Sequence, residues 1–219
     1  MVRSDKGKRA LSFLVTGAVM TALYLIICHC MGRTPSMKPW RCALKVPINL
    51  CWLLTAWILG KPFKERSERK IFLALVFYAL GDIIAPASYL VGGGAYGIGH
   101  LFAIDGYIRS YGMSGKQLLS LAGISAVFII ILISSLGFDW RIPLIAVYII
   151  ILATLLVSSS GDKYYFLTVG IFLFSDVIAY VRKMFFNHDW LYDITLSVYY
   201  AAIIMYCLSF RRKKTESVK

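Results

Sequence analysis

Two aspartates occupy equivalent positions in two similar apolar segments. In the first segment an apolar run leads from Phe72 to Asp82, and in the second a similar run leads from Phe166 to Asp176. Each aspartate lies ten residues after its phenylalanine, and an aliphatic-Ile-Ala triplet follows it. A carboxylate inside a membrane span is costly, so it indicates a functional site. The two aspartates together predict a site with paired carboxyl groups.

Paired carboxyl groups suit acid–base chemistry. Two of them close together in a low-dielectric site do not both ionise readily, so one keeps its proton while the other is charged. Asp82 and Asp176 would then provide both an acid and a base. The structural alternative is that the two side chains only join neighbouring helices through hydrogen bonds.

Further polar side chains within apolar segments are candidates to support this site. His100 is a candidate catalytic residue, because it can orient an aspartate or share a proton with it. Lys45 and Arg141 can pair with the aspartates or bind an anionic lipid headgroup, and interfacial snorkelling is the alternative. The remaining candidates, which can bind substrate or join helices, are Asn49, Tyr148, Tyr199 and Tyr200.

The other acidic and sulfur-containing side chains favour structural roles. Asp105 lies four residues before Arg109, a spacing that predicts an ion pair on one helix. The five cysteines are an odd number in mostly apolar positions, which favours buried apolar side chains over a disulfide framework. A bridge from Cys28 or Cys30 to Cys42 is the alternative. The three histidines lie on separate segments, so no metal ligand set is expected.

Composition predicts an all-α polytopic membrane protein that forms a single transmembrane domain. Of its 219 residues 59% are hydrophobic and 16% charged, and the mean hydropathy is +0.71. Soluble domains have about 25% charged residues. The net charge of +13 comes from basic residues that collect between and beyond the apolar runs. Such residues set topology and contact lipid headgroups, so no nucleic-acid partner is expected.

Apolar runs close to the length of a membrane-spanning helix recur along the chain and predict about eight spans. The predicted spans cover residues 10–31, 41–60, 70–91, 95–112, 117–137, 141–159, 164–184 and 192–210. The first is too long for the apolar core of a signal peptide, so it is expected to be retained. The triplet Gly92-Gly93-Gly94 is expected to form a tight turn before the fourth span and to allow close helix packing.

Eight spans place both termini on one side of the membrane. Most of the 24 Lys and Arg residues fall on that side, so both termini are expected in the cytoplasm of a multi-pass membrane protein, in the plasma membrane if the source is a bacterium. Asp82 and Asp176 each lie about 12 residues, or roughly 18 Å of helix, from the cytoplasmic start of their spans. The two carboxyl groups are therefore expected at matching depth near the middle of the membrane.

The chain is expected to contain an internal repeat of four spans. The first unit covers residues 10–112 and the second residues 117–210, followed by a basic cytoplasmic tail at 211–219. Besides the aspartate segments, Lys45-Val46-Pro47 and Arg141-Ile142-Pro143 open the second and sixth spans, where proline suits the first helical turn. Four spans per unit would give a parallel repeat about an axis along the membrane normal.

The order and spacing of these residues resemble the YhhN-like lysoplasmalogenase family. The resemblance runs from Lys45 and Pro47 through Gly81-Asp82, Gly97-Ile98-Gly99-His100 and Ser175-Asp176 to Tyr199-Tyr200. The chain departs from the family pattern at Val46, which separates the lysine from the proline, and at Ala103, where the family often has an aromatic residue.

The resemblance implies hydrolysis of the vinyl ether bond of lysoplasmalogens to a fatty aldehyde and a glycerophospho-base, without a metal or other cofactor. The expected partners are the lysophospholipid substrate and membrane lipids. Protonation of the alkene carbon gives an oxocarbenium ion, to which water adds. A protonated carboxyl group can donate that proton, while an ionised one stabilises the cation and activates water. Asp82 and Asp176 are the expected pair, with His100 in support.

Three other functions fit the same residues. In a proton-coupled transporter, buried aspartates would relay protons and the repeat would support alternating access. In a non-catalytic lipid-binding protein, the aspartates would only pair helices. A zinc-dependent intramembrane hydrolase is the third alternative.

Overall fold

A computed structural model describes residues 2–31, 35–60, 63, 65–136, 142–182 and 188–216 of the chain. Within these residues eight α-helices and one short 3-10 helix, η1 (Pro35–Met37), follow one another, and there are no strands. The α-helices are α1 (Val2–Met31), α2 (Lys38–Gly60), α3 (Arg66–Ile84), α4 (Tyr89–Tyr111), α5 (Gly115–Leu136), α6 (Ile142–Ser159), α7 (Lys163–Val181) and α8 (Asp189–Glu216). The all-α fold predicted from the sequence is confirmed.

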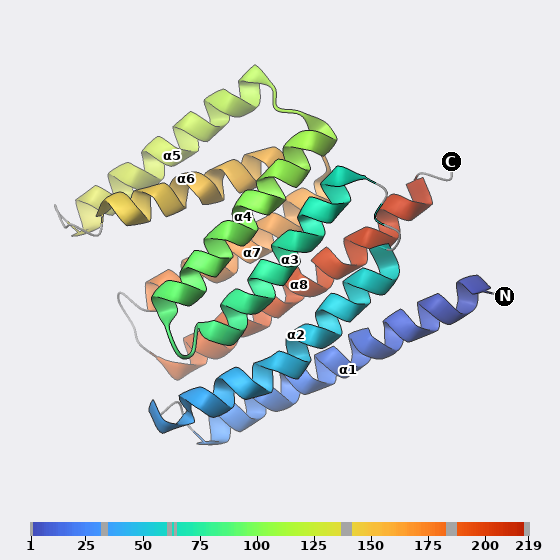
Figure 1. The fold of residues 1–219 in the computed structure, drawn as a ribbon. Coiled ribbons are helices and arrows are strands. Elements are labelled where there is room, and N and C mark those ends of the chain that lie inside the picture. The colour runs from blue at the N-terminus through green and yellow to red at the C-terminus, as the bar shows by residue number, and fades with distance from the viewer. Residues whose placement is uncertain are drawn as a thin grey trace.

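Helices that follow one another in the chain pack side by side. The main pairs are α1 with α2, α3 with α4, α5 with α6 and α7 with α8, and α8 also packs against α2 (Figure 1). Short connections favour such antiparallel neighbours. Both termini lie at the same end of the bundle, as an even number of antiparallel helices requires. The parallel repeat and the assignment of the termini to the cytoplasm remain predictions.

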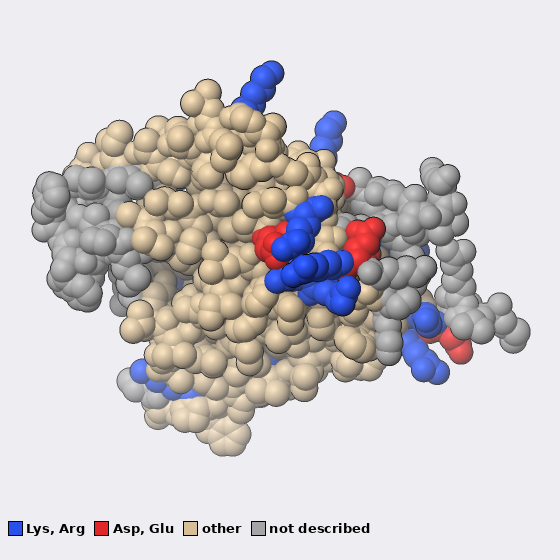
Figure 2. All heavy atoms as spheres, turned by 45° about the horizontal axis from the view of Figure 1, so that its top comes forward, with Lys and Arg blue, Asp and Glu red and all other residues tan. Residues whose placement is uncertain are grey.

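The outer surface of the bundle is that of a membrane protein. Among the described residues three segments are long and apolar enough to cross a membrane, namely Asp5–Cys30, Lys38–Gly60 and Trp190–Arg211, and Ala146–Ser159 is a shorter apolar helix. On α1 a stripe of apolar side chains that are each more than half exposed comprises Leu11, Val15, Val19, Leu23 and Ile26. Most of the face in Figure 2 is uncharged, and its charged side chains form one cluster near the centre of the view, with a few others toward the edges. Large exposed apolar areas of this kind mark contact with lipid.

The core lies where α8 meets α2, α3 and α7. From α8 it contains Tyr199, Ile203 and Tyr206, which meet Trp52 of α2 and Tyr78 of α3. Several of the candidate polar residues are also buried in this region: Lys45, Asn49, Asp82, His100, Tyr199 and Tyr200. The core therefore holds polar groups that must find their partners within the protein, because neither lipid nor apolar side chains can supply them.

The turn between α3 and α4 lies at residues 85–88, so the prediction of a turn at Gly92-Gly93-Gly94 is wrong. Pro86 ends α3, because proline lacks the N–H that a helix interior needs. Ser88 then caps α4, with its side chain accepting a hydrogen bond from the Val91 N–H at 3.4 Å. Proline and a capping serine together therefore set this turn, and the glycines lie inside α4.

Glycines at seven-residue intervals on α4 bring it close to α3. A Cβ atom would lie 2.7 Å from Ala85 Cα at Gly92, 2.6 Å from the Tyr78 ring at Gly99 and 2.9 Å from Ile71 at Gly106. These separations leave no room for a side chain. Close packing on the fourth span is thus confirmed, although Gly92 is the only member of the glycine triplet with a neighbour within 4 Å.

The predicted position of Pro47 in a first helical turn is also wrong. The α2 helix begins at Lys38, which places Pro47 in its interior. The apolar run starts near Arg41, but the backbone continues as a helix through the polar residues before it. Pro143, its counterpart in the expected repeat, is the second residue of α6 and does lie in a first turn. The two prolines therefore occupy different helical positions.

We expect Gly99→Ala to destabilise the protein by about 1–3 kcal/mol, because the new methyl group must push the buried Tyr78 ring away. Gly97 has no neighbour within 4 Å, so Gly97→Ala should be neutral or stabilising by up to about 1 kcal/mol through helix propensity. Thermal unfolding of the two variants in detergent measures the difference. Equal stability of the two variants would contradict the close packing of α3 and α4.

Candidate active site

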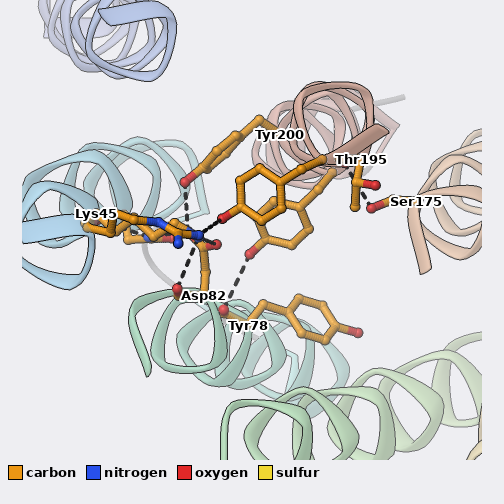
Figure 3. A network of polar contacts seen from close by, with 10 residues as sticks. Lys45, Tyr78, Asp82, Ser175, Thr195 and Tyr200 are labelled. Atoms are coloured by element: carbon orange, nitrogen blue, oxygen red, sulfur yellow. Dashed lines mark hydrogen bonds and ion pairs between the residues drawn. The ribbon is translucent and has the colours of Figure 1, made fainter. Parts of the chain in front are cut away.

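Asp82 is held by three side chains from two other helices. Its Oδ1 accepts a hydrogen bond and an ion pair from the Lys45 ammonium of α2. Its Oδ2 accepts hydrogen bonds from Asn49 Nδ2 of α2 at 2.9 Å and from the Tyr200 hydroxyl of α8 at 2.6 Å. Figure 3 shows Lys45 and Tyr200 converging on Asp82 from their separate helices. Both carboxylate oxygens are thus occupied by donors.

The ion pair lies in the interior of the bundle. The Lys45 side chain is 2% exposed and that of Asp82 is 1% exposed. Lys45 and Asn49 are one turn apart on α2, so they lie on the same face. Asn49 Nδ2 also donates to the Lys45 carbonyl at 2.9 Å. One of its two hydrogens thus binds the helix backbone and the other binds the Asp82 carboxylate. A buried charge persists only when it is paired and hydrogen-bonded in this way.

Pro86 affects the same network indirectly, because it has no backbone N–H. In a continuous helix the Asp82 carbonyl would accept from the N–H of residue 86, but proline has none. The Lys45 ammonium donates to that carbonyl instead, at 3.2 Å. Lys45 therefore binds both the side chain and the backbone of Asp82. The sequence signal for this contact is the proline four residues after the aspartate.

Asp176 belongs to a second and looser network. Its Oδ2 accepts from the Tyr148 hydroxyl of α6 at 3.3 Å and lies 3.9 Å from His100 Nε2 of α4. The Asp176 side chain is 25% exposed. None of the lysines and arginines that the structure describes forms an ion pair with it. The second carboxyl group therefore lacks the lysine that the first one has.

His100 connects this network to α3. Its Nδ1 is hydrogen-bonded to the Tyr78 hydroxyl at 3.0 Å, and its Nε2 lies 3.4 Å from the Tyr148 hydroxyl. Tyr148 donates its own proton to Asp176, so a neutral His100 donates from Nε2 and accepts at Nδ1. Hydrogen bonds thus run from Tyr78 through His100 and Tyr148 to Asp176.

No contact among the described residues joins Asp82 directly to Asp176. Tyr78, which binds His100, lies one turn before Asp82 on α3, and the Phe172 ring packs 4.8 Å from the Tyr78 ring. The Tyr199 hydroxyl donates to the Tyr78 carbonyl at 3.3 Å and therefore joins α8 to α3 instead of binding a carboxylate. Aromatic side chains line the space between the two networks.

The two aspartates also differ in their position along their helices. Asp82 is two residues before the last residue of α3, Ile84, whereas Asp176 is five residues before the last residue of α7, Val181. Asp176 is therefore three residues farther from the end of its helix than Asp82 is, because Pro86 ends α3 soon after its aspartate. The matching depth of the two carboxyl groups in the membrane stays a prediction.

A model of the YhhN family matches residues 40–210 of the chain. The chain belongs to the YhhN family. The family match spans both hydrogen-bond networks, from Lys45 to Tyr200. No curated protein sequence and no solved structure matches the chain. Membership in the YhhN family and the membrane-protein fold are compatible with a hydrolase.

Three further expectations for this YhhN-family chain concern an ion pair, the cysteines and Arg141. The Asp105–Arg109 ion pair is confirmed at 2.7 Å, and Lys70 adds a second ion pair to Asp105 at 3.0 Å. All five cysteines are free thiols, so no bridge joins the first three. Arg141 lies outside the described residues.

Sequence reasoning missed a basic and aromatic cluster next to the Asp82 network. Arg41 of α2 donates to the Tyr192 hydroxyl of α8 at 2.7 Å. The Lys45 ammonium lies 5.6 Å from the centre of the Tyr24 ring of α1. Arg41 lies four residues before Lys45, and this spacing is the signal that could have placed both cations on one face of α2.

An apolar groove between α2 and α3 leads to the Asp82 network. It has a volume of about 150 Å³ and is lined by Val46, Asn49, Leu50, Leu53, Val76, Ala79, Leu80 and Ile83. Val46, Leu50 and Leu80 are exposed on the outer surface. Asn49 both lines the groove and binds the Asp82 carboxylate. In this YhhN-family chain an apolar surface therefore leads from the outside of the bundle to Asn49, which binds a buried carboxylate.

We expect Lys45→Met to destabilise the protein by about 3–5 kcal/mol, because it leaves the buried Asp82 carboxylate without a counter-charge. The double variant Lys45→Met/Asp82→Asn removes both charges and should recover much of that loss. Asp176→Asn should cost less than about 1 kcal/mol, because its carboxyl group is partly exposed and has no lysine partner. A double-mutant cycle by thermal unfolding in detergent measures these differences. Additive effects at Lys45 and Asp82 would contradict the buried ion pair.

Proposed function

We propose that this protein is a lysoplasmalogenase-type hydrolase, which cleaves the vinyl ether bond of lysoplasmalogens in the membrane. The observation that carries the proposal is the buried Asp82 carboxylate, which is bound by Lys45 and by Asn49, a residue that also lines an apolar groove. Membership in the YhhN family supports the same reaction class. A single-chain lipid has the two properties that this arrangement requires, a hydrocarbon chain and a polar bond close to it.

The reaction adds water across an activated double bond. A proton is transferred to the alkene carbon, and the resulting oxocarbenium ion is attacked by water on the carbon that bears the ether oxygen. The hemiacetal then loses its glycerol oxygen as an alcohol, so the products are a fatty aldehyde and a glycerophospho-base. The net change is the addition of one water molecule, without oxidation or reduction. The protein therefore has to supply a proton, stabilise a cation and orient water.

Asp82 is suited to stabilise the cation and to orient the water. Its ion pair with Lys45 and its hydrogen bonds from Asn49 and Tyr200 hold the carboxylate in one position. A fixed anion in a site that excludes water stabilises a developing positive charge more effectively than an anion in solution. The same carboxylate can accept a proton from the attacking water, as carboxylates do in glycoside hydrolysis.

Asp176 is the proposed proton donor. No lysine or arginine among the described residues pairs with it, and its exposed fraction of 25% allows a proton to be replenished. Its hydrogen bond from Tyr148 links it to His100, which completes a path for that proton. The aromatic side chains between the networks, Tyr78, Phe172 and Tyr199, would then border the reacting bond.

The groove between α2 and α3 is the proposed path for the hydrocarbon chain. Apart from Asn49 its lining is apolar, and its outer residues face the surface that contacts lipid. A chain that lies in this groove remains in an apolar environment while its polar end reaches Asp82. The substrate would thus enter sideways from the membrane.

Purified protein in detergent should release aldehyde from lysoplasmenylethanolamine. Asp82→Asn and Asp176→Asn, each checked for folding, should lower kcat/KM by at least about 100-fold, the usual contribution of an acid–base group. Tyr200→Phe removes one donor to Asp82 and should cost about 10-fold. Aldehyde release measured by a coupled dehydrogenase follows all four proteins.

Asp105→Asn is the matched control, because Asp105 is an acid of the same bundle that pairs with Lys70 and Arg109 instead. It should keep wild-type activity. Wild-type protein that is inert toward several lysoplasmalogens but moves a lipid or a solute into liposomes unchanged would replace the hydrolase with a transporter. Full activity in Asp176→Asn, together with none in Asp82→Asn, would remove Asp176 as the donor and leave the Lys45 ammonium in that role.

A further inference from the structure

Two arginines border the same tyrosine ring beside the Asp82 network. The guanidinium carbon of Arg41, on α2, lies 5.1 Å from the centre of the Tyr192 ring, and that of Arg182, at the end of α7, lies 5.0 Å from it. Arg41 also donates to the Tyr192 hydroxyl at 2.7 Å. Two helices, α2 and α7, thus bring two cations to one aromatic side chain of α8.

Each of the two arginines has a buried N–H donor that finds no hydrogen-bond acceptor. The Nε atoms of Arg41 and Arg182 are both buried and have no hydrogen-bond partner. The Arg41 residue is only 9% exposed. Neither arginine forms an ion pair with a carboxylate in the described part of the chain, and the adjacent Asp193 pairs with His29 of α1. Buried charged donors of this kind are normally satisfied, so they indicate an anionic ligand.

We infer that Arg41 and Arg182 form a binding subsite for the phosphate of a lysophospholipid. The guanidinium group presents several N–H donors in a plane that matches phosphate oxygens. Lys45, one of the two cations that the sequence offered for an anionic headgroup, is paired with Asp82. Tyr24, whose ring lies beside Lys45, also interacts with Arg41 through its hydroxyl. The identity of the ligand rests on the proposed function.

The order of residues along α2 matches the order of groups in the lipid. Arg41, Lys45, Asn49 and Leu53 lie on successive turns, about 6 Å apart along the helix. They belong in turn to the arginine pair, the Asp82 network and the apolar groove. A lysoplasmalogen has its phosphate, its ether bond and its hydrocarbon chain in the same order, with a short glycerol unit between the first two. The phosphate would therefore bind at the arginines while the chain lies in the groove.

A non-cleavable lipid separates binding from catalysis. The probe is a lysophosphatidylethanolamine with a saturated alkyl ether chain, and its partner is the alkylglycerol with the same chain but no phosphate. Equilibrium binding of each probe is measured on detergent-purified wild type, Arg41→Gln and Arg182→Gln. We expect each substitution to weaken binding of the phosphate-bearing lipid by about 10-fold or more and to leave the alkylglycerol unchanged.

Arg69→Gln is the matched control, because Arg69 is an exposed arginine on α3 and its loss changes the net charge equally. It should bind both probes as wild type does. Unchanged binding of the phosphate-bearing lipid in both arginine variants would overturn the subsite. An equal loss for both probes, with a lower unfolding temperature, would do so as well, because it would show that the arginines only hold α2, α7 and α8 together.

Inorganic phosphate distinguishes the two possible sources of the anion. We expect it to compete with the lipid probe only at millimolar concentration, because it lacks the chain that occupies the groove. Tight binding of inorganic phosphate that depends on both arginines, with no effect of either arginine on the lipid, would assign the subsite to free phosphate and overturn the lipid proposal. Arginine-dependent lipid binding in a protein that releases no aldehyde would keep the subsite and reject the hydrolase.

Discussion

The buried ion pair between Lys45 and Asp82 is the constraint that fixes the centre of this protein. Neither charge reaches water, so each must be compensated by groups of the protein itself. The compensation comes from α2, α3 and α8 together, because Tyr200 completes the carboxylate's hydrogen bonds. The hydrogen bonds of this network therefore fix the three helices relative to one another. The glycines of α4 then hold a fourth helix close to α3, which places His100 within reach of Tyr78.

The same constraint makes the two aspartates unequal. Asp82 is immobilised by an amide, a phenol and an ammonium, whereas Asp176 has one long hydrogen bond and contact with the surface. A symmetric pair that shares one proton would need the two carboxyl groups in direct contact. Because their environments differ, Asp82 can hold a charge while Asp176 delivers a proton. This difference is the chemical basis of the proposed reaction.

The sequence predicts much of this arrangement from the cost of polar groups among apolar ones. That cost identifies Asp82, Lys45, His100 and Tyr148 as residues that must find partners, and the structure brings them together in two networks. The turn at Pro86 and the interior position of Pro47 were missed because hydropathy marks where apolar residues are, and not where a helix begins or ends. Arg41 was missed because a cation at the edge of an apolar run looks like an interfacial residue, and only its neighbours on other helices show that it is buried.

Pro86 has a consequence for the proposed reaction. By ending α3 it frees the Asp82 carbonyl, whose dipole points to the Lys45 ammonium. If Asp82 accepts a proton in the proposed reaction, its attraction for Lys45 weakens, whereas the backbone oxygen stays unprotonated and still accepts a hydrogen bond from the ammonium. In that reaction the turn would hold Lys45 next to Asp82 while the carboxyl group gains and loses its proton.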